Sequence, residues 1–221
     1  LHPSEFLPWD NSKFILQSQK DGFNHLYLYN KEGQQLKQLT SGPWVVMKFL
    51  GFNKKTQSAI ILSNEKNPLQ KNLYAVNIKT GKRTLLDDGI GVTRAAMLSA
   101  SGEQVYQKYC APEIPLNIDV RRTSDGKGYQ LHKAEDPWKN YQQPIFEMGS
   151  IKAADGMTDL YYRMVKPADF DATRKYPTVV YVYGGPHAHN VDASWHWASR
   201  SWETYMAQKG YIVFILDNRG S

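Results

Sequence analysis

The feature that most constrains this chain is an internal repeat with a period of roughly 45–47 residues. The dipeptide Leu26-Tyr27 in HLYLYNKEGQQLKQLT returns as Leu73-Tyr74 in NLYAVNIKTGKRTLL. A weaker third copy contains LNIDVRRTSDGKGYQLHK. Each copy has an alternating strand pattern, a turn with glycine and a second alternating strand, and a further strand pattern precedes it.

This period, with several short strands per copy, is typical of a β-propeller blade. A twisted blade buries its faces only against neighbouring blades, and three copies do not close a ring. We therefore expect further blades outside this sequence, which we interpret as a piece of a longer protein. An ordinary antiparallel meander or a β-sandwich is the alternative that the pattern leaves open.

The pattern changes after a stretch rich in proline and glutamine at residues 135–144, which reads as a linker. The following IFEMGSIKAADGMTDLYYRMVKP predicts two strands around a turn at Asp155-Gly156. TVVYVY, residues 178–183, is apolar throughout, which predicts a central strand covered on both faces.

ASWHWASRSWETYMAQKG predicts one helix, with Asp192 as its N-cap and Gly210 just beyond its end. YIVFILD, residues 211–217, then predicts a second apolar strand. Strand, helix and strand in this order form a βαβ unit with parallel strands. The predicted fold class is therefore β-propeller blades in residues 1–137, followed by the first part of an α/β domain in residues 138–221.

Composition excludes several function classes. The net charge is +6, but lysine and arginine are scattered without a basic stripe, so we expect no nucleic-acid partner. The one cysteine, Cys110, excludes an intrachain disulfide and a cysteine-based zinc site, and its strand-like surroundings predict a buried structural thiol. No apolar run reaches 18 residues, which predicts no membrane-spanning helix. The sequence also lacks the basic and apolar pattern of a signal peptide.

The stretch YVYGGPHAHN holds the candidate site. The chain contains no G-x-S-x-G, P-loop or H-E-x-x-H motif. Tyr183 ends a predicted parallel strand, at the sheet edge where ligands of open α/β sheets bind, and its hydroxyl could stabilise an oxyanion. A tyrosine packed into the core is the alternative reading. His187 and His189 follow in a loop with no carboxylate cluster nearby, so we expect no metal site.

Several separate motifs carry a family resemblance. KYPTVVYVYGGPHAHNVDASW and YMAQKGYIVFILDNRGS resemble the start of the catalytic domain in serine peptidases of the prolyl oligopeptidase family. The similarity is greatest to the dipeptidyl peptidase IV branch, and within it to bacterial prolyl tripeptidyl aminopeptidases. SQKDGFNHLYLYNKEGQQLKQLTSGPWVV resembles a late propeller blade of that branch.

The resemblance implies a propeller followed by an α/β-hydrolase domain with a Ser-Asp-His triad. It implies that Tyr183, the tyrosine of the Y-G-G-P motif, donates its hydroxyl to the oxyanion hole, and that His187 and His189 line the rim on the leaving-group side. The family's triad residues lie beyond DNRGS. Ser221 follows Arg219-Gly220 and does not match the nucleophile motif, so we expect the isolated chain to be inactive.

The resemblance thus implies a serine exopeptidase that cleaves peptides after proline near their amino terminus and releases dipeptides or tripeptides. It implies substrate peptides with proline near the amino terminus, an exported or periplasmic protein and, because relatives in this branch are often dimers, a homodimer. We expect no cofactor or metal. A propeller-type binding module with a non-catalytic hydrolase remnant is the alternative. An endopeptidase or acylaminoacyl peptidase of the same family is a third reading.

Overall fold

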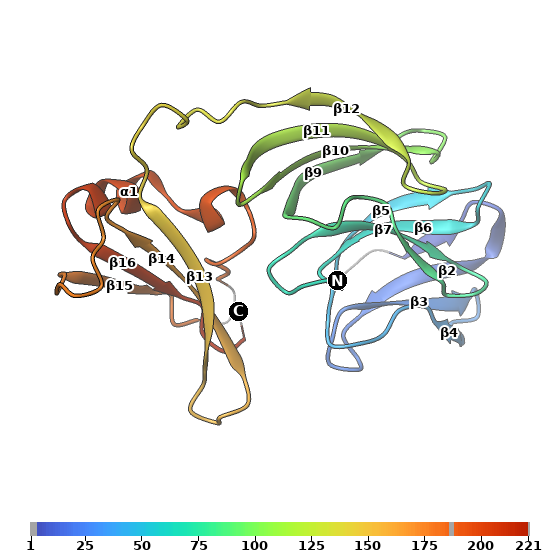
Figure 1. Ribbon diagram of the computed structural model, residues 1–221. Coiled ribbons are helices and arrows are strands. Elements are labelled where there is room, and N and C mark those ends of the chain that lie inside the picture. Colours follow the sequence, from blue (N-terminus) through green and yellow to red (C-terminus); the bar gives the residue numbers. More distant parts are fainter. Residues whose placement is uncertain (1–3, 186–187, 221) are drawn as a thin grey trace. The chain divides into compact units, whose positions relative to one another are not determined.

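The computed structural model describes residues 4–185 and 188–220, and the chain forms two compact units (Figure 1). The first unit holds the residues up to Cys110 together with Leu116–Lys133. The second unit holds Ala111–Pro115 and the residues from Ala134 onward. Within the described residues, no helix is both long and apolar enough to cross a membrane.

The first unit consists of three four-stranded antiparallel sheets, each formed by consecutive strands. The first sheet contains β1 (Glu5–Leu7), β2 (Asp10–Ser18), β3 (His25–Asn30) and β4 (Gln35–Gln38). The second contains β5 (Val46–Asn53), β6 (Ser58–Ser63), β7 (Asn72–Asn77) and β8 (Arg83–Leu85). The third contains β9 (Val92–Leu98), β10 (Gln104–Ala111), β11 (Ile114–Arg122) and β12 (Gly128–Lys133).

A short turn with a glycine joins the third and fourth strands of each of these three sheets. In each turn a glycine with positive φ donates its N–H to a carbonyl three or four residues earlier, a conformation that residues with a Cβ adopt only at a cost. The pairs are Gly33 with Asn30 at 3.0 Å, Gly81 with Asn77 at 2.8 Å and Gly126 with Arg122 at 2.9 Å. The sequence repeat is therefore a repeat of whole four-stranded sheets, as predicted for blades.

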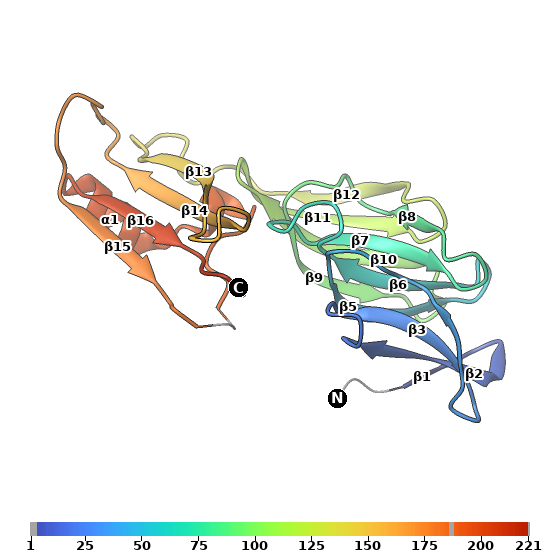
Figure 2. The same cartoon turned by 90° about the horizontal axis from the view of Figure 1, so that it is seen from below.

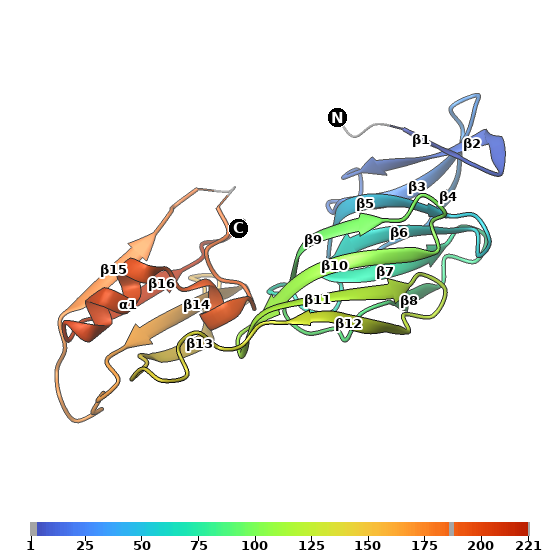
Figure 3. The same cartoon turned by 90° about the horizontal axis from the view of Figure 1, so that it is seen from above.

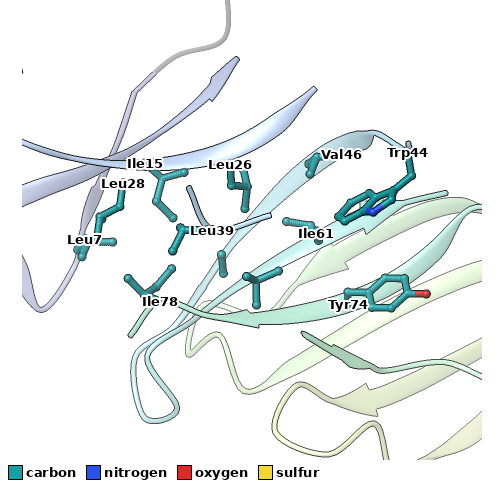
Figure 4. Close-up of a cluster of buried hydrophobic side chains, with 12 residues drawn as sticks. Leu7, Ile15, Leu26, Leu28, Leu39, Trp44, Val46, Ile61, Tyr74 and Ile78 are labelled. Carbon is teal, nitrogen blue, oxygen red and sulfur yellow. The ribbon is translucent and has the colours of Figure 1, made fainter. Parts of the chain in front are cut away.

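The middle sheet is buried on both faces because the other two sheets lie on either side of it (Figures 2 and 3). Every residue of β6 is buried. Ile61 belongs to the cluster shared with the first sheet (Figure 4), whereas its neighbour Ile60 belongs to the cluster shared with Ala96 and Val105 of the third sheet. Side chains alternate along a strand, so a strand covered on both faces is apolar throughout. Blade faces thus bury against neighbouring blades, as expected. Cys110 is buried and unpaired, as predicted.

The second unit is built on one mixed sheet with the order β13-β14-β16-β15. β13 (Ile145–Lys152) and β14 (Asp159–Lys166) form the predicted hairpin, and β14 pairs antiparallel with β16 (Ile212–Leu216). β15 (Thr178–Val182) runs parallel to β16, and α1 (Ser201–Gln208) lies between them in the chain. The predicted βαβ unit is confirmed.

Two details of this unit differ from the sequence-based prediction. β15 lies at the edge of the sheet, with Val180 62% and Val182 52% exposed, so it is not covered on both faces here. Among the described residues, no strand pairs with its outer edge. An apolar strand pattern indicates that both faces of the strand can be buried. It does not specify which segment of the chain packs against them.

The predicted helix is also shorter than its sequence pattern. Only α1 is α-helical, and the residues before it form a 3-10 turn at Trp195–Ala198. His196, Trp197 and Ala198 have φ angles of 50°, 55° and 67°, a left-handed conformation that a continuous helix excludes. Asp192 therefore does not cap α1, and it instead accepts the Ser194 N–H at 3.0 Å. Gly210 follows α1 with φ 85°, as predicted for a helix end.

Candidate oxyanion site

Tyr183 is the first residue after β15, and its side chain is 59% exposed. The exposure contradicts the alternative in which this tyrosine packs into the core. Val182 pairs with Leu216 in the parallel register, so Tyr183 and Asp217 directly follow neighbouring strands at one edge of the sheet. The carboxyl ends of parallel strands form the ligand-binding edge of such sheets.

The ring of Tyr183 lies against the backbone of Gly185. A Cβ placed on Gly185 would be 2.7 Å from Cε1 of the ring, closer than real contacts of this kind, and 3.1 Å from Cδ1, which is tighter than most. Gly184 has φ 75°, which turns the chain sharply after the strand without a Cβ penalty. The two glycines thus have separate roles: the first allows the turn, and the second makes room for the ring.

Asp217 holds the far end of the same loop. Its Oδ1 accepts the backbone N–H of Asn190 at 2.9 Å and the Asn190 side-chain amide at 3.1 Å. Its Oδ2 accepts the backbone N–H groups of Val191 at 2.9 Å and of Asn190 at 3.0 Å. The carboxylate is buried, and charged acceptors make the stronger hydrogen bonds. The loop is therefore fixed where it returns to the sheet.

A second set of polar groups, of which Arg163 and Glu203 are buried, also bonds to Asn190. The Asn190 carbonyl accepts Nε of Arg163 at 3.1 Å, and its side-chain oxygen accepts Nη2 of Arg200 at 3.2 Å. Both Nη atoms of Arg163 bond to the carboxylate of Glu203, which also accepts the Arg200 N–H at 3.0 Å. Arg163 and Glu203 are almost completely buried, so the network joins β14, the loop and α1 with little competition from water.

Three histidines lie in or near this loop in the sequence, and none has a hydrogen bond to Tyr183 among the described residues. His187 lies outside the described residues. His189 is half-exposed, with Nδ1 3.9 Å from Oδ2 of Asp217. His196 is stacked between Phe146 and Trp195, at centroid distances of 4.1 and 3.9 Å, and burial lowers its pKa. In the part of the chain that the structure describes, no group of three His, Cys, Asp or Glu residues is placed to hold a metal ion.

A positively charged side chain, Arg219, follows the strand that neighbours β15. Arg219, two residues after Asp217, pairs with Asp155 in the turn of the β13–β14 hairpin. The hydroxyl of Thr158 and the N–H groups of Thr158 and Met157 also bond to Asp155 and, with Arg219, hold the pKa of its carboxyl below its usual range. The hairpin turn is thereby tied to the segment after β16.

Sequence reasoning predicted Tyr183 as a site residue, which stays a prediction, and it did not predict the residues that hold the loop after it. Asp217 could have been found by the same rule, since it directly follows the other parallel strand. No sequence pattern indicates that Arg163 and Glu203, which lie 40 residues apart, form a pair. The arrangement provides one exposed, uncharged hydrogen-bond donor on a loop with a rigid base, which is suited to binding a developing oxyanion.

Residues 1–116, just over half of the chain, match the family model for the dipeptidyl peptidase IV N-terminal region. The chain belongs to the dipeptidyl peptidase IV family. The structure of a Bacteroides ovatus protein assigned as a dipeptidyl aminopeptidase IV superposes with a TM-score of 0.91 at 42% sequence identity, and the match covers all of this chain. The Porphyromonas gingivalis dipeptidyl peptidase 4 has a TM-score of 0.86 at 31% identity over 98% of the chain.

A curated relative is the prolyl endopeptidase FAP of Bos taurus, with 29% identity over 95% of this chain. The chain spans 28% of that relative, and 34% and 30% of the two bacterial structures. The similarity to both structures extends through both units, so the predicted fold class, propeller blades followed by the start of an α/β-hydrolase domain, is confirmed.

Proposed function

We propose that the protein containing this chain is a serine exopeptidase that hydrolyses peptide bonds after proline near the substrate's amino terminus. The observation that carries the proposal is the exposed Tyr183 at the carboxyl end of a parallel strand, inside a Y-G-G-P motif. The names of the relatives, dipeptidyl peptidase 4 and prolyl endopeptidase, support the same substrate class.

In this proposal Tyr183 supplies one donor of the oxyanion hole. When a serine attacks the scissile carbonyl, negative charge develops on the carbonyl oxygen. A hydroxyl that donates to this oxygen binds the charged transition state more strongly than the neutral substrate, so it raises kcat. His189 and His187 would then line the rim on the leaving-group side, and of the two only His189 lies within the described residues.

The proposed domain organisation follows from the same function. Residues 1–137 are the last blades of a propeller domain, and residues 138–221 begin the hydrolase domain. The Ser-Asp-His triad is supplied by other parts of the protein, as the resemblance implies. The protein would act without metal or cofactor, on peptide substrates and as a homodimer.

The test is hydrolysis of chromogenic peptides by the full-length protein. We expect turnover of an Xaa-Pro or an Xaa-Xaa-Pro anilide with a free amino terminus, and the preferred length distinguishes dipeptide from tripeptide release. The amino-acetylated versions of the same substrates are the matched controls, and an exopeptidase should cleave them poorly. Equal cleavage of acetylated substrates would indicate an endopeptidase or acylaminoacyl peptidase instead.

The isolated 221-residue chain should show no turnover of either substrate. Hydrolysis by that chain would contradict the proposal that the triad lies elsewhere in the protein. A folded full-length protein with no hydrolytic activity would favour the alternative, a propeller-type binding module with a non-catalytic hydrolase remnant.

A further inference from the structure

We propose that Gly185 and Asp217 are positioning residues for the Tyr183 hydroxyl, an inference that rests on the function proposed above. The two residues act on different parts of one loop. Gly185 sets where the tyrosine ring lies, and Asp217 sets where the loop after it rejoins the sheet. Neither residue contacts the reacting atoms, and both act through Tyr183.

Gly185 acts on the tyrosine ring through its lack of a Cβ. Ordinary contact with a Cβ begins near 3.4 Å, and a Cβ on Gly185 would be 2.7 Å from the Tyr183 ring, so alanine would force a shift of about 0.7 Å. The ring is more than half exposed, so it can swing away instead of straining the core. A displacement of this size at an oxyanion donor lowers the rate because the hydrogen bond depends on distance and direction.

Asp217 acts on the loop through hydrogen bonds that its carboxylate accepts. The loop leaves the sheet at Tyr183 and returns at Asn190, and all three donor groups there point at the Asp217 carboxylate. Each of the two carboxylate oxygens accepts at least one backbone N–H, so a side chain at this position needs two acceptor atoms. An asparagine at this position would turn an amide N–H₂ toward N–H donors in either orientation of the amide. Asp217→Asn thus keeps the shape and one acceptor oxygen, and it replaces the other acceptor with a donor that faces the loop N–H groups.

The control variant is Val213→Ala in β16, the strand that Asp217 directly follows. Val213 is completely buried, so its truncation destabilises the sheet without changing any hydrogen bond of the loop. Comparison with this variant separates loss of loop position from loss of stability. Active sites are counted with an irreversible, serine-reactive phosphonofluoridate, so that kcat refers to folded enzyme only.

The experiment measures kcat and KM of the full-length protein and its variants on the preferred proline anilide. Gly185→Ala and Asp217→Asn should each lower kcat by about 10- to 100-fold with KM nearly unchanged. Val213→Ala should keep the wild-type kcat per active site. In a Tyr183→Phe background, Gly185→Ala and Asp217→Asn should cost little more, because the hydroxyl that they position is already gone.

Two results would overturn the inference. One is a wild-type kcat in both single variants, and the other is a full additional loss in the Tyr183→Phe background. If Asp217→Asn does not fold, Gly185→Ala still decides, because Gly185 is only half-buried and the ring that its Cβ would meet is 59% exposed. Failure of the proposed function looks different, since an inactive wild-type protein, or a Tyr183→Phe variant with unchanged kcat, would remove Tyr183 from catalysis altogether.

Discussion

Removal of one charge from the buried Arg163–Glu203 pair should weaken the second unit severely. The two side chains are 2% and 0% exposed, so Glu203→Gln leaves a guanidinium without a counter-charge where water cannot replace it. Breaking a buried pair in this way costs about 3–5 kcal/mol. Arg163 keeps its bond to the Asn190 carbonyl, which offsets only part of that cost.

The assay is native-state hydrogen exchange of the full-length protein, read by mass spectrometry over β14 and α1. A loss of 3–5 kcal/mol corresponds to amide exchange roughly 10²- to 10⁴-fold faster in these elements. The matched control is Glu135→Gln, which breaks the exposed i,i+4 pair with Lys139. It should change the free energy of opening, as measured by exchange, by less than about 1 kcal/mol.

A double variant, Arg163→Leu with Glu203→Leu, should recover much of the loss because neither charge is then left buried alone. The reasoning would be refuted if Glu203→Gln were as mild as Glu135→Gln. That outcome would mean that the pair is solvated in solution and does not hold the loop.

Three further predictions concern other parts of the chain. Ile61→Ala should lower the free energy of opening of β6, measured by hydrogen exchange, by about 2–5 kcal/mol. A loss below about 1 kcal/mol would contradict the stacking of the first two sheets. Gly102→Ala should prevent stable folding of the first unit, seen by circular dichroism, because its Cβ would lie 2.0 Å from the Phe52 carbonyl oxygen. Burial holds the pKa of the His196 imidazole below its ordinary 6.5. The contribution of the neutral ring to the free energy of unfolding is therefore complete above pH 6.5 and is lost as the pH falls below that value. The stability of the second unit should therefore decline from pH 7 to pH 5, and His196→Phe, which keeps the stacking, should remove this slope.

Local patterns in the sequence predicted the blades well. The repeated strands and the glycine turns are determined by residues within about 50 positions of each other, and period-2 alternation reports them directly. The same holds for the β13–β14 hairpin, where Asp155 and Gly156 form the turn.

Prediction failed where distant segments decide the outcome. The apolar pattern of 178–183 does not reveal that β15 is an edge strand among the described residues. The aromatic run at Trp195 has helical spacing, yet the backbone turns left-handed there while the His196 ring stacks on Phe146, 50 residues earlier in the chain. Tertiary contacts of this kind override local helix propensity.

The candidate site was half predicted for the same reason. Tyr183 was placed at the end of a strand because strand ends can be read from sequence, and its role, which the resemblance supplied, stays a prediction. The contact between its ring and Gly185, and the convergence of Asn190 and Val191 on Asp217, depend on how the loop folds back. These contacts involve groups that no periodicity brings together.

The most direct test of the account is the kcat of full-length Tyr183→Phe on a proline anilide, normalised to titrated active sites. The account predicts a loss of about 10²- to 10³-fold, as for removal of one oxyanion-hole donor, with KM nearly unchanged. An unchanged kcat in the folded variant would contradict it, because the exposed hydroxyl at the end of β15 would then have no part in the reaction.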